Sequence, residues 1–372
     1  MKRRDFVAGL GAGAATAALG GCAPDAQRAA GPGRDDRVFN WKMVTTWPTN
    51  FPAVGTGAEA LARLIGRISG GRIRVRAYGA GELVPAFEVF DTVASGTAEM
   101  GHGASYYWKG KSEAAQFFSA IPFGFNAQEM NAWLYHGGGL ALWREVYAPF
   151  GLLPHPAGNT GVQMGGWFNR ELHSVADLQG LKMRIPGLGG EVLRRAGGTP
   201  VNLPGGEIFT ALKTGGIDAT EWVGPYNDLA FGLHQAARYY YYPGWHEPGT
   251  TTEVIFNKEA FDDLPEDLRE LVLTACRAAN DDMLAEFTAR NNEALAVLVQ
   301  EHGVELRRFP ADVLDRLREL SREVIEELAA ADPLVARVWQ SQQAFLRQVR
   351  AWHDVSEAAY YLARGPGAGA SV

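Results

Sequence analysis

The feature that most constrains the fold is an alternation of strand-like and helix-like segments that starts near residue 41. Residues 41–46 suit a strand, and apolar residues then recur every three or four positions from Ala58 to Ile68, as on one face of a helix. From residue 73 to 77, apolar residues alternate with arginines, which predicts a second strand. A strand, a helix and a strand in this order form the unit of a largely parallel sheet.

The same alternation continues as far as residue 257. We expect helices at residues 87–94, 130–146, 189–196 and 205–213, strands at 161–168, 182–185, 219–223 and 251–257, and a short segment at 99–103. Ser174 is placed to cap a short helix that Gly180 ends. Because no change in composition interrupts this region, the pattern predicts an α/β fold with two lobes that share one cleft.

From residue 263 onward the pattern changes to long helices, and no strand is expected in this last third of the chain. Apolar residues recur on one helical face from Leu268 to Phe287. The last helix should begin near Pro333, and it carries an apolar residue every seven positions, at Val338, Phe345, Trp352 and Ala359. Such a stripe fits packing on the same domain as well as it fits a second subunit, so both interpretations stay open.

The first 22 residues have the order of a bacterial export signal, with basic residues followed by an uncharged stretch rich in Ala and Gly. The adjacent Arg3 and Arg4, followed by Phe6, indicate the twin-arginine route. The stretch is too short for a membrane helix, which needs roughly 20 strongly apolar residues. Cys22 follows Leu-Gly-Gly and could be acylated, although small residues are expected before any cleavage site. Residues 23–37 lack periodicity and suit a flexible tether.

Charge, cysteine content and motifs narrow the range of functions. A formal net charge of −7 and the lack of any Lys/Arg run argue against nucleic acid or a membrane surface as a partner. After removal of the signal only Cys276 is certain to remain, so no disulfide within the chain is expected. The sequence has no Cys-x-x-Cys, haem-attachment, Gly-x-Ser-x-Gly or His-Glu-x-x-His motif, and this favours a protein that is not an enzyme. Gly55-x-Gly57-x-x-Ala60 matches a dinucleotide fingerprint only loosely, because the strand before it ends too early.

Carboxylates rather than histidines are the candidate metal ligands. The eight histidines are dispersed, and no two have the spacing of a transition-metal site, so a bound metal would be hard and oxygen-ligated. Glu221 and Glu247 lie among aromatic residues near predicted strand ends, where α/β proteins place ligand residues. A carboxylate in such surroundings needs a compensating cation. Each could instead be a structural carboxylate held by hydrogen bonds.

Arg184 is the candidate partner for an anionic ligand. In the predicted strand at 182–185 it points away from the face that Met183 and Ile185 share. A guanidinium at a strand end can grip a carboxylate through two parallel hydrogen bonds. An exposed arginine at a sheet edge would fit the same pattern.

Several long segments resemble the periplasmic binding subunit of tripartite ATP-independent periplasmic (TRAP) transporters, in the branch that binds 2-oxo acids and related monocarboxylates. Two of them read Leu-Lys-Met-Arg-Ile-Pro-Gly at 181–187 and Ile-Asp-Ala-Thr-Glu-Trp-Val-Gly-Pro at 217–225. The others are residues 87–104, 158–168 and 239–247, and the similarity covers nearly the whole mature chain. The resemblance implies an α/β fold of the periplasmic-binding-protein type, with two hinge-linked lobes, a long helical C-terminal part and no catalysis.

The resemblance also implies roles for individual residues. Arg184 would pair with the ligand carboxylate, and the amide oxygen of Gln163 would contact both ligand and metal. Glu221, the backbone carbonyl of Trp222 and Glu247 would complete the ligands of a cation, which is sodium or in some relatives calcium. The cleft would further be lined by Asn159, His102, Gly103, Ala104, Tyr106 and Trp245.

These implications describe a periplasmic solute-binding subunit that captures a 2-oxo monocarboxylate such as pyruvate together with a metal ion and delivers it to a membrane permease. Lobe I would span residues 38–158 with a return segment at 252–305, and lobe II residues 159–251. The C-terminal helices, residues 306–364, would form a homodimer, because relatives of this branch exchange a helix there. A ligand sensor for a signalling receptor and a periplasmic enzyme on the same fold stay as alternatives, as do sodium and calcium.

Overall fold

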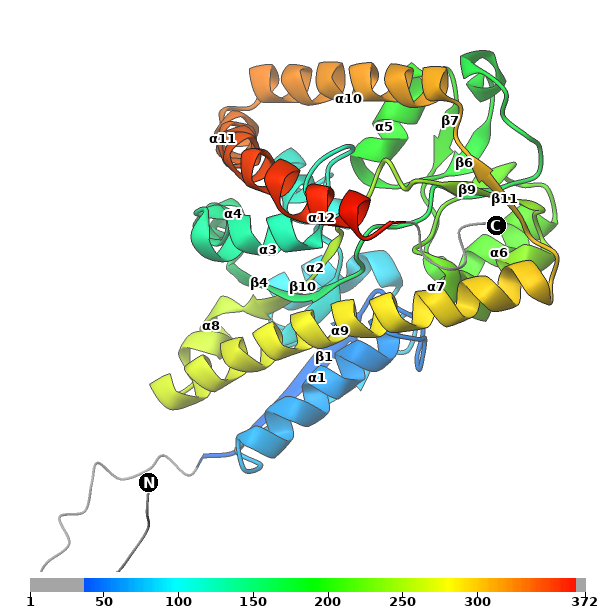
Figure 1. The fold of residues 1–372 in the computed structure, drawn as a ribbon. Coiled ribbons are helices and arrows are strands. Elements are labelled where there is room, and N and C mark those ends of the chain that lie inside the picture. The colour runs from blue at the N-terminus through cyan, green and yellow to red at the C-terminus, as the bar shows by residue number, and fades with distance from the viewer. Residues whose placement is uncertain (1–36, 366–372) are drawn as a thin grey trace, which may run out of the picture. The chain divides into compact units, whose positions relative to one another are not determined.

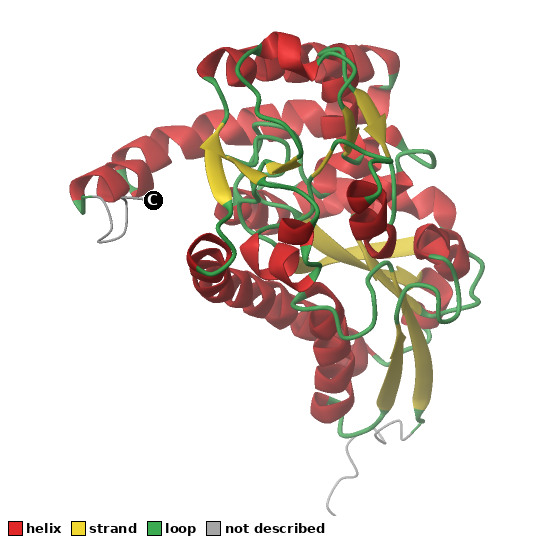
Figure 2. Ribbon diagram, turned by 90° about the vertical axis from the view of Figure 1, so that its right-hand side faces the viewer, coloured by secondary structure: helices red, strands yellow, loops and turns green. Residues whose placement is uncertain are grey.

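A computed structural model describes residues 37–365 of the chain (Figure 1). The expected export signal, Cys22 and all but the last residue of the expected tether lie outside the described residues. Two β-sheets organise the described part, and helices pack around both of them (Figure 2). The predicted α/β fold class, with two lobes and long C-terminal helices, is confirmed.

The first sheet has five strands in the order β2-β1-β3-β10-β4, and its strands with their helices are called lobe I below. The strand bounds are β1 Phe39–Thr45, β2 Ile73–Tyr78, β3 Met100–Gly103, β4 Leu152–Asn159 and β10 Thr251–Asn257. β1, β2 and β3 are parallel, and β10 runs antiparallel between β3 and β4. In β2, Ile73 is buried while the arginines are exposed, as the alternation predicted.

The second sheet has six short strands in the order β11-β9-β5-β8-β6-β7, and the part built on it is called lobe II. The bounds are β5 Gly166–Phe168, β6 Lys182–Arg184, β7 Thr199–Val201, β8 Ala219–Thr220, β9 Tyr239–Tyr242 and β11 Glu305–Arg308. β5 runs antiparallel to both of its neighbours, and the other pairs are parallel. Each sheet is therefore largely parallel with one reversed strand, β10 in the first sheet and β5 in the second, and each of these two strands follows a crossing from the other sheet.

Helices connect the strands and cover the sheets. The α-helices are α1 Val54–Ile68, α2 Val89–Ala94, α3 Ala127–His136, α4 Gly139–Tyr147, α5 Gly187–Arg195, α6 Gly205–Lys213, α7 Pro225–Ala230, α8 Lys258–Asp262, α9 Glu266–Gln300, α10 Ala311–Ala331, α11 Pro333–Val355 and α12 Glu357–Ala363. Short 3-10 helices lie at Ala86–Glu88, Ser105–Trp108, Glu113–Phe118, Ala148–Phe150, Val175–Leu178 and Leu233–Gln235. The helix α9 packs along α1 and β4, and α10 packs on α5 and α11 (Figure 1).

Local signals set several of these boundaries. The expected cap at Ser174 is present as a capping box with Asp177, and Asn126 and Glu129 form another at the start of α3. The single helix predicted at 130–146 is in fact two helices. Gly138 separates them with a φ of 86°, which glycine adopts without a steric penalty.

The chain crosses between the two sheets three times, at residues 159–166, at 242–251, and where α9 leads into β11. The first two crossings lie side by side. The Thr160 N–H donates to the Thr250 carbonyl at 2.9 Å, and the Gln163 N–H donates to the Glu247 carbonyl at 3.2 Å. Side chains from these crossings therefore lie between the two lobes.

The expectation that the last third of the chain lacks strands is wrong, because β11 pairs in parallel with β9. Val338 in α11 is buried and Phe345 packs against the core, whereas Trp352 is 62% exposed and Leu362 in α12 is 84% exposed. The apolar stripe thus packs on its own chain only in its first half. No helix within residues 37–365 has the length and apolar character to cross a membrane.

Candidate ligand and cation site

Arg184 is buried inside the second sheet. Its strand β6 lies between β8 and β7, and its side chain is 1% exposed, so it is not an exposed arginine at a sheet edge. The guanidinium donates to the Glu221 carboxylate, and Nε donates to the Leu203 carbonyl at 3.1 Å. Its Cζ also lies 5.2 Å from the centroid of the Trp222 ring. These contacts fix the fork of the guanidinium at the end of β6.

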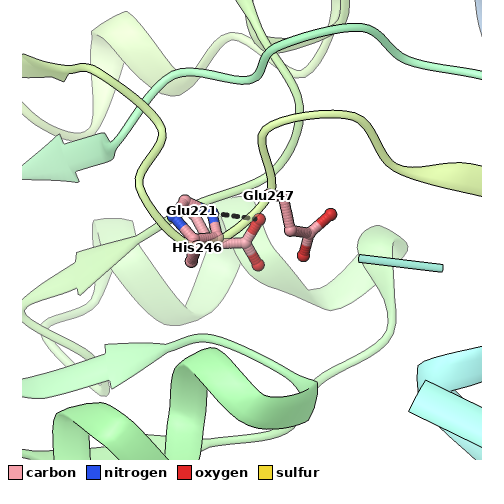
Figure 3. A group of neighbouring side chains, drawn as sticks. All are labelled: Glu221, His246 and Glu247. Carbon is pink, nitrogen blue, oxygen red and sulfur yellow. Dashed lines mark ion pairs between the residues drawn. The ribbon is translucent and has the colours of Figure 1, made fainter. Parts of the chain in front are cut away.

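Three side chains gather beside this arginine, namely Glu221, His246 and Glu247 (Figure 3). Glu221 directly follows β8, while His246 and Glu247 belong to the crossing between β9 and β10. All three are buried, and one ligand atom from each lies within 4.8 Å of the others. The Nε2 atom of His246 is 3.4 Å from Oε2 of Glu221. Two carboxylates this close in a buried place require positive charge to stay ionised.

Gln163 connects the first two of the three crossings, residues 159–166 and 242–251. Its Nε2 donates to Oε2 of Glu247 at 2.8 Å and lies 3.1 Å from the Thr160 hydroxyl and 3.2 Å from the Thr250 hydroxyl. The Thr250 hydroxyl in turn donates to the same Glu247 oxygen at 2.6 Å. This network orients the Glu247 carboxylate and leaves the amide oxygen of Gln163 without a hydrogen-bond partner among residues 37–365.

The electrostatic balance of the site is set by burial and by this carboxylate pair. Burial raises the pKa of Glu247 to about 7, and the neighbouring charge of Glu221 adds to that rise. For Arg184, burial alone would lower the pKa, but the Glu221 charge holds the pKa above its ordinary value, so the guanidinium stays charged. The buried guanidinium of Arg184 thus faces the two buried carboxyl groups of Glu221 and Glu247.

Lobe I forms the opposite wall of the site. The Nη2 of Arg184 donates to the Tyr107 hydroxyl at 3.4 Å, which joins the two lobes. Tyr106 is buried, and burial together with the Glu247 charge raises its pKa. His102 is buried and accepts a hydrogen bond at Nδ1 from the Trp47 indole at 2.7 Å. Burial lowers the pKa of His102 to about 4, so this ring is neutral near pH 7.

The remaining predicted residues lie around these. Gly103 is the last residue of β3, Ala104 follows it, and both are buried close to Tyr106 in the chain. Asn159 uses its amide within the crossings: Nδ2 donates to the Gly249 carbonyl at 3.2 Å, and Oδ1 accepts from the Gly161 N–H at 2.8 Å. Trp245 is buried and stacks on Phe123 with 5.9 Å between ring centroids.

The donor set fits a hard cation. The amide oxygen of Gln163 and Oε2 of Glu221 are buried and accept no hydrogen bond within the described chain. An unsatisfied buried acceptor is unfavourable, and an oxygen-seeking cation such as sodium or calcium would satisfy both atoms. Further oxygen ligands are available from the Glu247 carboxylate and from the backbone carbonyl of Trp222, the residue after Glu221.

Comparison with known proteins identifies the family of the chain. Residues 43–332 match the family described as bacterial extracellular solute-binding protein, family 7. The chain is 44% identical over 362 residues to a monocarboxylate 2-oxoacid-binding periplasmic protein of Nostoc sp., which covers 97% of this chain and 98% of the relative. The chain belongs to the bacterial extracellular solute-binding protein family 7.

Two solved TRAP periplasmic solute-binding proteins are similar in structure to this family 7 chain. A TRAP periplasmic solute-binding protein from Colwellia psychrerythraea, with bound calcium and pyruvate, is 44% identical with a TM-score of 0.85 over 87% of this chain and 99% of that one. The corresponding protein from Pseudoalteromonas atlantica, with bound sodium and pyruvate, is 43% identical with the same TM-score and coverage.

Sequence reasoning missed several residues of this family 7 site. His246 stands beside the predicted Glu247, but nothing in the dispersed histidines marked it as a neighbour of Glu221. Tyr107 and the hydroxyls of Thr160 and Thr250 were also missed. Tyr107 contacts Arg184, 77 positions away along the chain, and Thr250 contacts Gln163, 87 positions away, so these contacts form only in the folded chain. The position of Tyr107 next to the predicted Tyr106 was the one available signal.

Proposed function

We propose that this family 7 receptor binds a 2-oxo monocarboxylate such as pyruvate, together with sodium or calcium, and delivers it without chemical change to a TRAP permease. The observation that carries the proposal is the buried cluster of Arg184, Glu221, Glu247 and Gln163 between the two lobes. It combines a fixed guanidinium fork with oxygen donors that lack hydrogen bonds.

In this proposal each residue has a separate task. Arg184 holds the ligand carboxylate through its fork, which suits a planar anion. Gln163, Glu221, Glu247 and the Trp222 carbonyl hold the cation. When bound, the cation supplies positive charge that the 2-oxo acid can chelate and that offsets the two glutamates. His102, Gly103, Ala104, Tyr106, Asn159 and Trp245 line the site, and the lobes close over the ligand and open for release.

The names of the similar proteins support the ligand class. The Nostoc relative is named for 2-oxoacid binding, and both solved relatives hold pyruvate with a cation. The same comparison supports capture without turnover, since these proteins are named as binding proteins.

Calorimetric titration of refolded, ligand-stripped protein tests the proposal. Pyruvate, 2-oxobutyrate and lactate are each titrated with sodium, with calcium and with neither. We expect tight binding of a 2-oxo acid that needs a cation, loss of binding in Arg184→Ala, and unchanged binding in the control Arg316→Ala, which alters a 42%-exposed side chain in α10. Binding of none of these acids, or consumption of pyruvate by the purified protein, would contradict the proposal.

We also propose export by the twin-arginine route, with Cys22 as a possible site of acylation. The supporting observation is the order of the first 22 residues. Replacement of Arg3 and Arg4 by lysine should retain the precursor in the cytoplasm. Replacement of Cys22 by serine should release the mature protein from the membrane fraction if that cysteine is acylated. An unchanged distribution in the arginine variant would exclude this export route.

The lobe boundaries of the proposal are residues 38–158 with 252–305 for lobe I, and 159–251 for lobe II. Residues 306–364 would form the dimerisation element, supported by the exposed Trp352, Val355 and Leu362. Light scattering during size-exclusion chromatography should report a dimer that Trp352→Glu dissociates. Gln348→Glu is the control, because it adds the same charge at an exposed polar position of α11. A monomeric wild-type protein at micromolar concentration would contradict the dimer.

A further inference from the structure

Asp228 is a buried carboxylate on α7 that none of the roles above uses. Its side chain is 1% exposed. Oδ2 accepts hydrogen bonds from the Trp167 indole at 2.9 Å and from the Tyr240 hydroxyl at 2.6 Å. These two rings stack on each other with 4.0 Å between centroids, so both donors are held by β5 and β9. The carboxylate is therefore fixed in position from the sheet side.

The other oxygen of Asp228 reaches the segment that follows β8. Oδ1 accepts a hydrogen bond from the Val223 N–H at 3.3 Å. The Val223 carbonyl accepts from the Met164 N–H at 3.0 Å, which ties the same segment to the crossing that carries Gln163. The N–H of Val223 thus bonds to α7, and its carbonyl bonds to the crossing at residues 159–166.

The Val223 N–H and the Trp222 carbonyl belong to one planar peptide unit. In a trans peptide the N–H and the C=O point in opposite directions, so a bond that holds one also aims the other. Within residues 37–365 the Trp222 carbonyl accepts no hydrogen bond, whereas the preceding Glu221 carbonyl accepts two. The oxygen of this carbonyl is therefore available to a bound cation.

We propose that Asp228 is a positioning residue for cation binding, which holds the Trp222–Val223 peptide so that the Trp222 carbonyl faces the cation. The inference rests on the proposed function, in which that carbonyl is a metal ligand. Groups that orient a metal ligand without touching the metal commonly change metal affinity 10–100-fold when they are removed, roughly the effect expected here. A purely structural role would instead be to satisfy Trp167 and Tyr240.

Three variants separate the two roles. Asp228→Leu removes both acceptors. Asp228→Asn keeps one oxygen, which cannot serve Val223 and Trp167 at once, because the amide nitrogen would then face an N–H donor. Trp167→Phe removes that donor, so in the double variant Trp167→Phe with Asp228→Asn the amide oxygen can turn to Val223. Trp167→Phe alone leaves the bond between Asp228 and Val223 in place.

The measurements are calorimetric titration of sodium and of calcium in the presence of pyruvate, and hydrogen–deuterium exchange of the peptide that spans Val223 in chelator-treated protein. We expect cation affinity to fall by about 10–100-fold in Asp228→Leu and at least several-fold in Asp228→Asn, with recovery in the double variant. Exchange at Val223 should be faster in both single Asp228 variants and return toward the wild-type rate in the double variant.

The outcomes distinguish the proposals. Cation affinity that is unchanged in Asp228→Asn, or lowered as much in Trp167→Phe as in Asp228→Asn, would overturn the positioning role. If Asp228→Leu does not fold, the comparison of Asp228→Asn with the double variant decides. If the wild-type protein binds no pyruvate with any cation, the proposed function fails, while the exchange measurement still reports whether Asp228 holds this peptide.

Discussion

Arg184 and Glu221 form an ion pair in which each side chain is 1% exposed. Transfer of both charges out of water is unfavourable, and their mutual attraction offsets this only with good geometry and further hydrogen bonds. Arg184 has such bonds to Leu203 and Tyr107, whereas Oε2 of Glu221 has none among residues 37–365. The pair is therefore a weak source of stability, as expected if it serves the proposed ligand binding.

Arg184→Ala should lower the free energy of unfolding by about 3–5 kcal/mol, because it leaves the Glu221 carboxylate buried without the guanidinium that pairs with it. The double variant Arg184→Met with Glu221→Leu should recover most of that stability and still bind no pyruvate. Urea denaturation and calorimetric titration check the two parts. A double variant as unstable as Arg184→Ala would show that the pair itself stabilises the fold.

Gly187→Ala should weaken ligand binding because the added methyl group hinders closure of the two lobes. Gly187 has a φ of 59°, and a Cβ there would lie 3.1 Å from Cβ of Tyr106 across the lobes. Gly180 has a φ of 69° with no atom within 4 Å of such a Cβ, so Gly180→Ala is the matched control. Both variants should lose roughly 1–2 kcal/mol of stability from the left-handed backbone. Only Gly187→Ala should also lower pyruvate affinity, and equal affinities would refute the contact.

The pH dependence of stability should include a contribution from Glu253 in β10. Burial raises its pKa to about 8, although the Trp108 indole and the Tyr147 hydroxyl both donate to this carboxyl. The unfolded value is about 4.3, so between these values the folded state binds more protons and stability falls as pH rises. Glu253→Gln should remove this slope, so its free energy of unfolding should match that of the wild type near pH 4 and exceed it at pH 8.5 by up to about 5 kcal/mol. Urea denaturation at several pH values checks this. If the free energy of unfolding changes with pH equally in wild type and Glu253→Gln, Glu253 is not the group responsible.

Cation and pyruvate together should stabilise the wild-type protein by about 2.7 kcal/mol at a ligand concentration 100 times Kd. Glu247→Gln should lose most of this gain, because a charged oxygen ligand becomes a neutral one. Thermal unfolding with and without chelator measures the difference. The Glu253→Gln protein is the control, since its altered carboxyl lies in the core of lobe I and should leave the gain intact.

The elements that the sequence predicted are those whose signals are local. β2 alternates cleanly, Ser174 caps its helix, and β10 is predicted with its observed bounds. β4 was missed because Pro154 and Pro156 argue against a strand, but β4 is an edge strand that pairs only with β10, and edges tolerate proline. β11 was missed because its four residues, Glu-Leu-Arg-Arg, are largely charged. They form a strand only by pairing with β9, which is distant in the sequence.

The candidate site divides in the same way. Arg184, Glu221 and Glu247 stand in recognisable motifs, and the structure brings them together with Gln163. The contacts of Asp228 and His246 could not be predicted, because they depend on which residues of separate strands and crossings face one another.

The three crossings have a consequence for how the chain must fold. β10 lies in the interior of the first sheet, so lobe I cannot be completed before residue 257 has been synthesised, and β11 completes lobe II only at residue 308. Pairings this distant in sequence form slowly, and chains cut short before β10 would present unpaired edges on β3 and β4 that favour aggregation. Because the chain crosses between the sheets three times, each lobe depends on segments that are synthesised after the chain has entered the other lobe.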